Sequence, residues 1–307
     1  MRLLSNIFIV FLLALTTSLQ AIQPVNSFPI PNKIQFAGQT ISLERYDMRE
    51  RFDREQTIIA YQHATSIMLL KRANKYFPII EPILKRNGVP EDFKYLAVIE
   101  SSLEVRAVSP VSAAGLWQLM PKTAEQFGLE VNEEVDERYH IEKSTEAACK
   151  YLKSAFAKYK SWTSAAISYN AGMGRISGEL EKQKVDDALD AYINMESSRY
   201  MFRILAMKQF IENPQRFGYR IEREHYYHNI GTKTVIVKDS VGDWTNWAAQ
   251  YGISYAQLKD FNAWLRERKL TNAGKKQYEI IIPDKNDLNF KNSLIKVHSS
   301  LINDNLY

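Results

Sequence analysis

One acidic residue, Glu100, lies on the apolar face of a predicted helix. Pro90 and the two acids after it favour helix initiation. Ala97, Leu96 and Phe93 precede Glu100 at helical spacing, so its carboxyl shares their side of the helix. Burying an unpaired carboxylate is costly and usually raises its pKa. Periodicity alone leaves two interpretations open: a general acid that works near neutral pH, or a partner of some Lys or Arg.

Other residue types that carry chemistry form no recognisable set. His225 and His228 stand close together but have no Cys or acid at ligand spacing, which disfavours a metal pair. Cys149, the only cysteine, falls in an apolar helical stretch and is predicted to be a buried core side chain. No phosphate-binding loop and no nucleophile triad is present. We therefore expect neither a metal nor a cofactor.

Helical periodicity covers most of the chain from residue 45 to residue 218 and predicts the frame that holds Glu100. A loop punctuated by Gly and Pro, residues 107–115, separates the Glu100 helix from a short helix that Pro121 opens and Gly128 closes. The other helices are expected over about residues 49–76, ending near Pro78, and over about residues 142–158, 162–169 and 186–211, the last stopped by Pro214.

The pattern changes on either side of this helical region. Residues 22–44 show no clear period and are interpreted as a linker or an extended arm. After a connector, residues 219–231, a compact module is predicted over residues 232–284. Its expected elements are a strand at 235–237, helices at 244–251 and 255–262, and a strand at 278–282. The tail, residues 285–307, is assigned no role.

The residues around Glu100 resemble the active-site region of the lytic transglycosylases, which belong with the goose-type lysozymes in glycoside hydrolase family 23. Two later segments are similar to the family's Tyr-Asn-Ala-Gly and Glu-Thr-Arg-x-Tyr motifs, the second with Ser for Thr. The resemblance covers about residues 50–215 and is closest to the membrane-bound lytic transglycosylase D group. The matching residues are Tyr95-Leu96-Ala97-Val98-Ile99-Glu100-Ser101-Ser102, Ala107, Ser109, Ala114-Gly115-Leu116-Trp117-Gln118, Met120-Pro121, Thr123-Ala124, Tyr169-Asn170-Ala171-Gly172 and Glu196-Ser197-Ser198-Arg199-Tyr200.

This resemblance implies a lysozyme-like α-helical catalytic domain that cleaves between N-acetylmuramic acid and N-acetylglucosamine in peptidoglycan. In the family's scheme Glu100 protonates the leaving oxygen and then deprotonates the muramic acid's own 6-hydroxyl, which leaves a 1,6-anhydro end. The sugar's N-acetyl group supports the positive charge that develops. The resemblance further implies substrate-binding roles for Ser109, Gln118, Tyr169, Asn170, Glu196 and Tyr200.

Several of these residues have a simpler interpretation. Tyr169 follows Trp162 and Ala165 at helical spacing, which suits core packing, and Asn170 suits a helix C-cap. Glu196 is either an ordinary exposed helical Glu or a second carboxylate that orients the acetamido group or activates water. Gly115 is expected to be structural, through a positive φ or a close backbone approach.

The C-terminal module resembles LysM domains, small βααβ units that bind glycans containing N-acetylglucosamine. Asp239-Ser240 and Trp244 depart from the pattern, since small polar residues are more usual there. The aromatic residues Trp244, Trp247, Tyr251 and Trp264 are predicted to be core rather than a sugar-stacking platform. The fold class is therefore expected to be mainly α, with a small βααβ module. The match is carried by Val241-Gly242-Asp243-Trp244, Trp247-Ala248, Tyr251-Gly252-Ile253-Ser254, Leu258, Asn262 and Ile280-Ile281-Ile282-Pro283.

Residues 1–21 have a basic start, a short apolar core and a small-residue end, which is typical of a cleaved secretory signal. The apolar run is shorter than a membrane span requires, and no cysteine near its end offers a lipid attachment point. We expect a protein of the periplasm or cell envelope that is not a lipoprotein and keeps no integral membrane span after cleavage. The net charge of +5 suits an anionic wall polymer but decides little.

Peptidoglycan glycan strands are the expected partner, and no nucleic-acid partner is expected. Two rival functions stay open at the level of sequence. A hydrolytic muramidase would use water in place of the 6-hydroxyl, and its products would carry reducing ends. If the protein is instead a non-catalytic wall-binding scaffold, loss of Glu100 would leave wall turnover unchanged.

Overall fold

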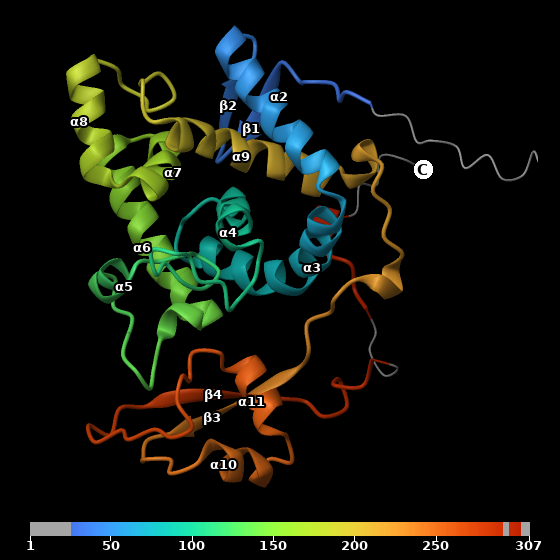
Figure 1. Ribbon diagram of the computed structural model, residues 1–307, viewed down its shortest axis with the longest axis vertical. Helices are drawn as coiled ribbons and strands as arrows, with labels where there is room; N and C mark the ends of the chain where they lie inside the picture. Colours follow the sequence, from blue (N-terminus) through green and yellow to red (C-terminus); the bar gives the residue numbers. More distant parts are fainter. Residues whose placement is uncertain (1–25, 291–294, 302–307) are drawn as a thin grey trace, which may run out of the picture.

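The protein was analysed as a computed structural model that describes residues 26–290 and 295–301. The predicted signal segment lies outside this part of the chain. Figure 1 shows two parts, a larger helical one and a smaller one that contains β3 and β4. Within the described ranges, no helix has the length and apolar character needed to cross a membrane.

The helical part is built around the short helix that carries Glu100. This helix, α4 (Lys94–Ser101), packs against α3 and α9, and Figure 1 shows it near the centre of the helical part. Tyr95, Leu96, Ala97 and Val98 are buried, so α4 is surrounded by core on most sides. The other helices are α2 (Tyr46–Tyr61), α3 (His63–Arg86), α5 (Pro121–Gln126), α6 (Ile141–Tyr159), α7 (Trp162–Ala171), α8 (Met173–Gln183) and α9 (Met195–Glu212).

The prediction of one helix over residues 49–76 was wrong in two respects. The chain breaks at Gln62, whose ψ of 58° is not helical, so α2 and α3 are separate helices. The second helix also continues through Pro78 and Pro82. Each proline removes one backbone donor, but residues such as Phe77 and Ile80 are completely buried there, and this packing outweighs the loss.

The linker expected over residues 22–44 contains a hairpin instead. Strands β1 (Lys33–Phe36) and β2 (Gln39–Ser42) pair antiparallel through a two-residue turn at Ala37-Gly38, both with positive φ. Side chains of the hairpin such as Phe36 and Ile41 are buried against the helical core. Strands this short leave too few residues to show alternation clearly.

The helix predicted over residues 186–211 begins later than expected. Residues 186–194 form a turn, bends and irregular chain. Helix α9 starts at Met195, where the Asn194 side chain accepts a hydrogen bond from the Ser197 amide at 3.2 Å. The sequence interpretation also missed α8, which follows directly after the positive-φ residue Gly172. Helices α6 and α7 agree with prediction, and Cys149 is buried as expected.

The C-terminal module has the predicted βααβ order. Strand β3 (Thr232–Val237) pairs antiparallel with β4 (Tyr278–Pro283), and α10 (Trp244–Gln250) and α11 (Tyr255–Phe261) lie between them in sequence. Trp244 and Trp264 are buried as predicted, whereas Trp247 and Tyr251 are half-buried and pack on each other. The expected fold class, mainly α with a small βααβ module, is confirmed.

The described part of the C-terminal tail returns to the helical part. Ile295 and Leu301 are buried, and Ser300 accepts a hydrogen bond from the buried Lys94 ammonium at 2.8 Å. The His298 ring lies 3.0 Å from a carboxylate oxygen of Glu81 on α3. This segment therefore covers the outer face of α3 and the start of α4.

Candidate active site

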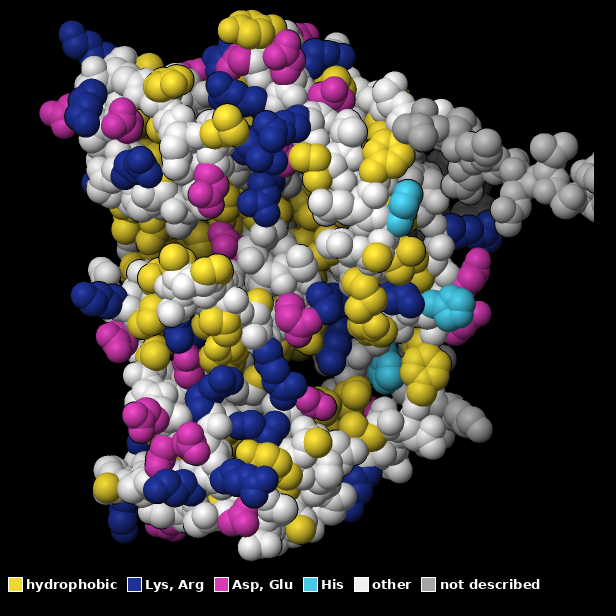
Figure 2. Space-filling view, viewed as in Figure 1, with side chains coloured by type: hydrophobic (Ala, Val, Ile, Leu, Met, Phe, Trp, Pro, Cys, Tyr) yellow, Lys and Arg dark blue, Asp and Glu magenta, His cyan; other side chains and the backbone are white. Residues whose placement is uncertain are grey.

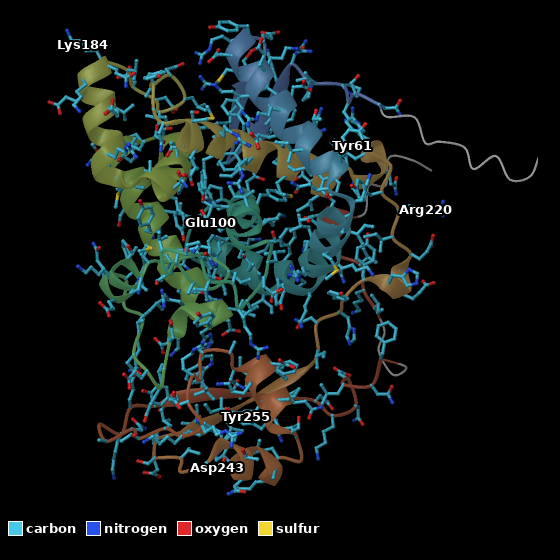
Figure 3. The ribbon with its side chains drawn as sticks, viewed as in Figure 1. Tyr61, Glu100, Lys184, Arg220, Asp243 and Tyr255 are labelled. Atoms are coloured by element: carbon cyan, nitrogen blue, oxygen red, sulfur yellow. The ribbon has the colours of Figure 1, made fainter. Side chains whose placement is uncertain are left out.

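Glu100 occupies the last turn of α4, beside the buried helix α9. The helix ends at Ser102, whose φ of 53° is left-handed, so the chain turns away directly after the acid. The Glu100 side chain is half-buried, and Tyr200 of α9 donates its phenolic hydrogen to Glu100 Oε1. Figure 3 shows Glu100 in the middle of the helical part, and Figure 2 shows this face hollowed across its middle, with apolar side chains in the hollow.

The surroundings of Glu100 raise the pKa of its carboxyl to about 7, mainly because burial disfavours the charged form. The hydrogen bond from Tyr200 and the charge of Arg203 lower this pKa, and the charge of Glu196 raises it. Within the described ranges Glu100 forms no ion pair. Of the two interpretations left open by the sequence, the structure therefore favours the general acid.

Two tyrosines that the sequence singles out have different partners. Tyr200 contacts the acid directly, while Tyr169 of α7 donates its hydroxyl hydrogen to the Trp117 carbonyl oxygen at 2.8 Å. Burial raises the pKa of both phenols well above 10, so both remain donors. Tyr169 also meets the Tyr151 ring edge-on at 5.0 Å, so it combines the predicted core packing with support of the loop after Gly115.

The loop over residues 107–119 is closed on itself by two of the predicted site residues. The Gln118 side-chain amide donates to the carbonyl oxygens of Ala107 at 3.1 Å and Gly115 at 2.9 Å. Ser109 Oγ accepts from the Ala113 amide at 3.0 Å. Both side chains are half-buried, and their hydrogen bonds hold the shape of the loop beside Glu100.

Gly115 is structural in both predicted senses. Its φ is +77°, and a Cβ at this position would lie 1.9 Å from the carbonyl oxygen of Arg138. Ser112, in the same loop, adopts a left-handed φ of 64°. The serine thus reaches a backbone conformation that glycine favours, and the turn forms without a glycine at this position.

Asn170 and Glu196 join α7 to the first turn of α9. Asn170 accepts a hydrogen bond from the Ser197 hydroxyl at 2.8 Å and donates one to Glu196 Oε1 at 3.4 Å. Because α7 continues to Ala171 and ends at Gly172, Asn170 is not its C-cap. Glu196 is exposed, yet its charge contributes to the raised pKa of Glu100.

Comparison with known families decides what these motifs belong to. Residues 77–191 match the family described as "Transglycosylase SLT domain". The chain carries a transglycosylase SLT domain. Residues 233–286 match the "Soluble lytic transglycosylase C-terminal LysM-like domain". The SLT match contains Glu100, the loop over residues 107–119, Tyr169 and Asn170, but ends before Glu196 and Tyr200.

The chain is also similar to individual curated proteins, one of which is named a lytic transglycosylase. Membrane-bound lytic murein transglycosylase D of Escherichia coli (strain K12) is 26% identical over 247 residues, which cover 76% of this chain and 53% of the relative. A putative tributyltin chloride resistance protein of Alteromonas sp. (strain M-1) is 29% identical over 117 residues, which cover 37% of this chain and 56% of the relative. The chain spans about half the length of these curated relatives.

Among solved structures, the 70 kDa soluble lytic transglycosylase SLT70 of Escherichia coli matches with a TM-score of 0.40 and 20% identity, over 52% of this chain and 28% of that one. Lytic transglycosylase Slt of Pseudomonas aeruginosa, an inactive E503Q mutant, matches with a TM-score of 0.37 and 20% identity, over 60% of this chain and 31% of that one.

Two arginines that hydrogen-bond backbone carbonyls near Glu100 or in the loop over residues 107–119 were not predicted from the sequence. Arg203 stands three residues after Tyr200 on α9 and donates to the Ile99 carbonyl oxygen at 3.1 Å. Its spacing from Tyr200 is the one local signal for it, because residues three apart on a helix are neighbours. Arg138 contacts the loop over residues 107–119 from a distant segment, and no sequence pattern indicates that contact.

Removing the Tyr200 hydroxyl should raise the pKa of Glu100 above about 7, because the lost hydrogen bond stabilises the carboxylate. We expect an NMR titration of the glutamate carboxyl carbons to show this upward shift in Tyr200→Phe. Tyr95→Phe is the matched control, since Tyr95 links the same two helices but donates to Glu212 at 2.9 Å. An unchanged or lowered value in Tyr200→Phe would show that the phenol does not tune the acid.

Proposed function

We propose that this protein is a peptidoglycan lytic transglycosylase that cleaves the β-1,4 bond between N-acetylmuramic acid and N-acetylglucosamine. The observation that carries the proposal is the state of Glu100, whose desolvated carboxyl has a pKa of about 7. A group with this pKa is protonated in a large fraction of molecules near neutral pH and ionises readily when it gives up its proton. The SLT and LysM-like matches support peptidoglycan as the substrate.

The proposed reaction uses this one carboxyl twice. Glu100 first gives its proton to the leaving oxygen of N-acetylglucosamine as the bond to muramic acid C1 breaks, and the substrate's acetamido group stabilises the positive charge. The resulting carboxylate then takes the proton of the muramic acid 6-hydroxyl, whose oxygen bonds to C1. Glu100 ends protonated again, no water is consumed, and a 1,6-anhydro end remains. Tyr200 supports the middle of this cycle, because its hydrogen bond stabilises the carboxylate.

The remaining predicted residues surround that acid in roles that we assign to substrate binding. Ser109 and Gln118 present polar groups from the loop over residues 107–119. Tyr169 supports the same loop, and Asn170 with Glu196 forms a polar pair at the start of α9, placed to hold the acetamido group. The proposal requires no metal or cofactor.

We further propose the organisation and location that this activity requires. The catalytic unit spans residues 45–218, with the hairpin of residues 33–42 packed on it, and the LysM-like unit spans residues 232–284. The connector 219–231 joins the two units. Export by the signal segment 1–21 would deliver the protein to the periplasm or cell envelope. The name of the Escherichia coli relative, a membrane-bound murein transglycosylase, supports an envelope location.

The test is mass spectrometry of the soluble products that the protein releases from purified peptidoglycan. We expect muropeptides from the native protein and none above background from Glu100→Gln. Glu104→Gln is the matched control, because Glu104 follows just after the end of α4, is exposed and pairs with Arg72 at 2.6 Å. Equal release by the native protein and Glu100→Gln, or no release by either, would overturn the proposal.

A further inference from the structure

The LysM-like module contacts the SLT domain mainly through residues 130–140. A second contact lies at Arg106, whose guanidinium donates to the Lys259 carbonyl oxygen at 2.7 Å and pairs with Asp260 at 3.0 Å. The Asp136 amide donates to the Trp264 carbonyl oxygen at 2.9 Å, and the Arg266 amide donates to the Glu134 carbonyl oxygen at 2.8 Å. Between these two bonds, Val135 pairs with Leu265 of the module. The junction thus has the character of a short sheet between the domains rather than of a loose contact.

Side chains make this junction part of the module's own core. Val135 and Tyr139 belong to the buried cluster that contains Trp264, Leu265 and Ile280. The His140 ring stacks on Trp264 at 5.6 Å, and burial lowers the pKa of His140 to about 3, so the ring is neutral. The cluster includes Ala114, which lies in the loop over residues 107–119 beside Glu100. The apolar core of the module therefore includes a residue of the active-site loop.

The segment also holds that loop through Arg138. The guanidinium donates to the Ser112 carbonyl oxygen at 2.6 Å and to the Leu119 carbonyl oxygen at 3.2 Å. Both carbonyls belong to the loop over residues 107–119. On its backbone side, the Arg138 carbonyl oxygen occupies the space where a Gly115 side chain would be. Arg138 thus contacts the loop from two directions.

Asp136 fixes the position of this guanidinium. Its carboxylate accepts from Arg138 Nε at 2.9 Å and from Nη2 at 2.7 Å, and both side chains are 9% exposed. A buried, two-pronged pair of this kind specifies geometry as well as energy. Since Asp136 is also the residue whose amide binds Trp264, the module and the loop are fastened to the same two residues.

We propose that Arg138 is a positioning residue, and that the LysM-like module acts through it to hold the loop over residues 107–119 in the conformation that binds substrate. This inference rests on the proposed function, and it gives the module a task in catalysis in addition to any contact with glycan. The loop is tied in turn to the helix of the acid, because Ser101 donates its hydroxyl hydrogen to the Leu116 carbonyl oxygen at 2.9 Å. A displaced loop would therefore misplace Ser109 and Gln118 relative to Glu100.

A further contact between the domains lies at Glu130, at the other end of the segment 130–140, and does not involve the loop over residues 107–119. Lys276 pairs with Glu130, and the Tyr278 hydroxyl donates to the same carboxylate at 3.0 Å. This contact joins the two domains without touching the loop over residues 107–119, and Lys276 is half exposed. Lys276→Met therefore weakens the junction while leaving the loop contacts of Arg138 in place.

The first test is hydrogen exchange of the loop amides, measured by mass spectrometry on the full chain. Arg138→Lys keeps the charge but cannot contact Asp136 and two carbonyls at once. Leu265→Ala loosens the junction from the module side, and Leu258→Ala is its matched control, since both leucines are completely buried in the module core. We expect about tenfold faster exchange over residues 107–119 in Arg138→Lys and Leu265→Ala, but not in Leu258→Ala or Lys276→Met.

The second test is the rate of glycan cleavage by the same four variants. Arg138→Lys and Leu265→Ala should lower kcat about 100-fold, because misplaced groups cost that much even when the chemistry is intact. The pH at which the rate falls should stay that of the native protein, since the acid keeps its surroundings. Native-like loop exchange and kcat in both variants would overturn the inference.

The two proposals fail in different ways. If the native protein releases no products from peptidoglycan, the proposed function fails, while the exchange experiment still reports whether the module holds the loop. If Arg138→Lys does not fold, Leu265→Ala and Arg266→Ala take its place, because the Arg266 guanidinium covers the Tyr139 ring at 4.3 Å from the module side. Equal effects of Leu265→Ala and Leu258→Ala on the loop would show a general loss of stability and would contradict the inference.

Discussion

Glu100→Gln should lower the rate of glycan cleavage by about 1000-fold, because general acid and base catalysis by one side chain typically contributes a factor of that size. Glutamine keeps the shape of the side chain and an oxygen for the Tyr200 hydroxyl, but its amide protons are not acidic enough to transfer to the leaving oxygen. The measurement is the initial rate of product release from saturating glycan strands. A variant that kept more than a tenth of the native rate would remove Glu100 from the centre of the mechanism.

The pH dependence of the free energy of unfolding tests the raised pKa of Glu100 separately from the rate of cleavage. A glutamate whose pKa rises from 4.5 to about 7 on folding stabilises the native state at low pH, and this contribution is lost as the pH rises through about 7. Glu100→Gln does not titrate, so its free energy of unfolding should depend less on pH across this window. Urea unfolding below pH 4.5 and above about pH 7 measures how much the free energy of unfolding changes in each protein. A steeper pH dependence in the variant would contradict the raised pKa.

Gly115→Ala should be among the most destabilising single changes in the chain. The new Cβ would meet the Arg138 carbonyl oxygen at 1.9 Å, and the φ of +77° is strained for alanine as well. Retreat of Arg138 is opposed by its pair with Asp136 and by its bond to the Ser112 carbonyl. We expect a loss of about 3 kcal/mol, which lowers Tm by about 6–12 °C for a domain of the size of the helical part.

Gly178→Ala is the matched control for this change. Gly178 lies inside α8, and a Cβ there would meet nothing within 4 Å. Alanine is favoured over glycine in a helix by about 1 kcal/mol, so this variant should unfold at the same temperature or slightly higher. Differential scanning calorimetry compares the two, and equal Tm values would show that the contact between Gly115 and Arg138 is not a rigid one.

Helical spacing in the sequence was sufficient to place the acid on its helix and to predict α6 and α7. Glu100 follows three apolar residues at that spacing, and the helix it predicts is α4. Pro121 and Gly128 mark the ends of α5 because their backbone preferences act locally. The break at Gln62 and the passage through Pro78 were not predictable in this way, because packing against the rest of the fold decides both.

The candidate site shows the same division. Glu100 and Gly115 were identified from the sequence and the resemblance, and Gly115 has both the positive φ and the close approach expected of it. The partners of these residues were not predictable, since Tyr200 lies 100 positions from Glu100 and Arg138 lies 26 from Ser112. Such contacts arise only when distant segments fold together, so spacing along the chain carries no trace of them.

The central claim is that the substrate's own 6-hydroxyl, rather than water, completes the reaction. The direct test is digestion of peptidoglycan in water enriched in the heavy isotope of oxygen, followed by mass spectrometry of the products. The account predicts unlabelled muropeptides about 18 mass units lighter than hydrolysed ones. Products that carry the heavy oxygen at a reducing end would contradict it and would make the protein a hydrolytic muramidase.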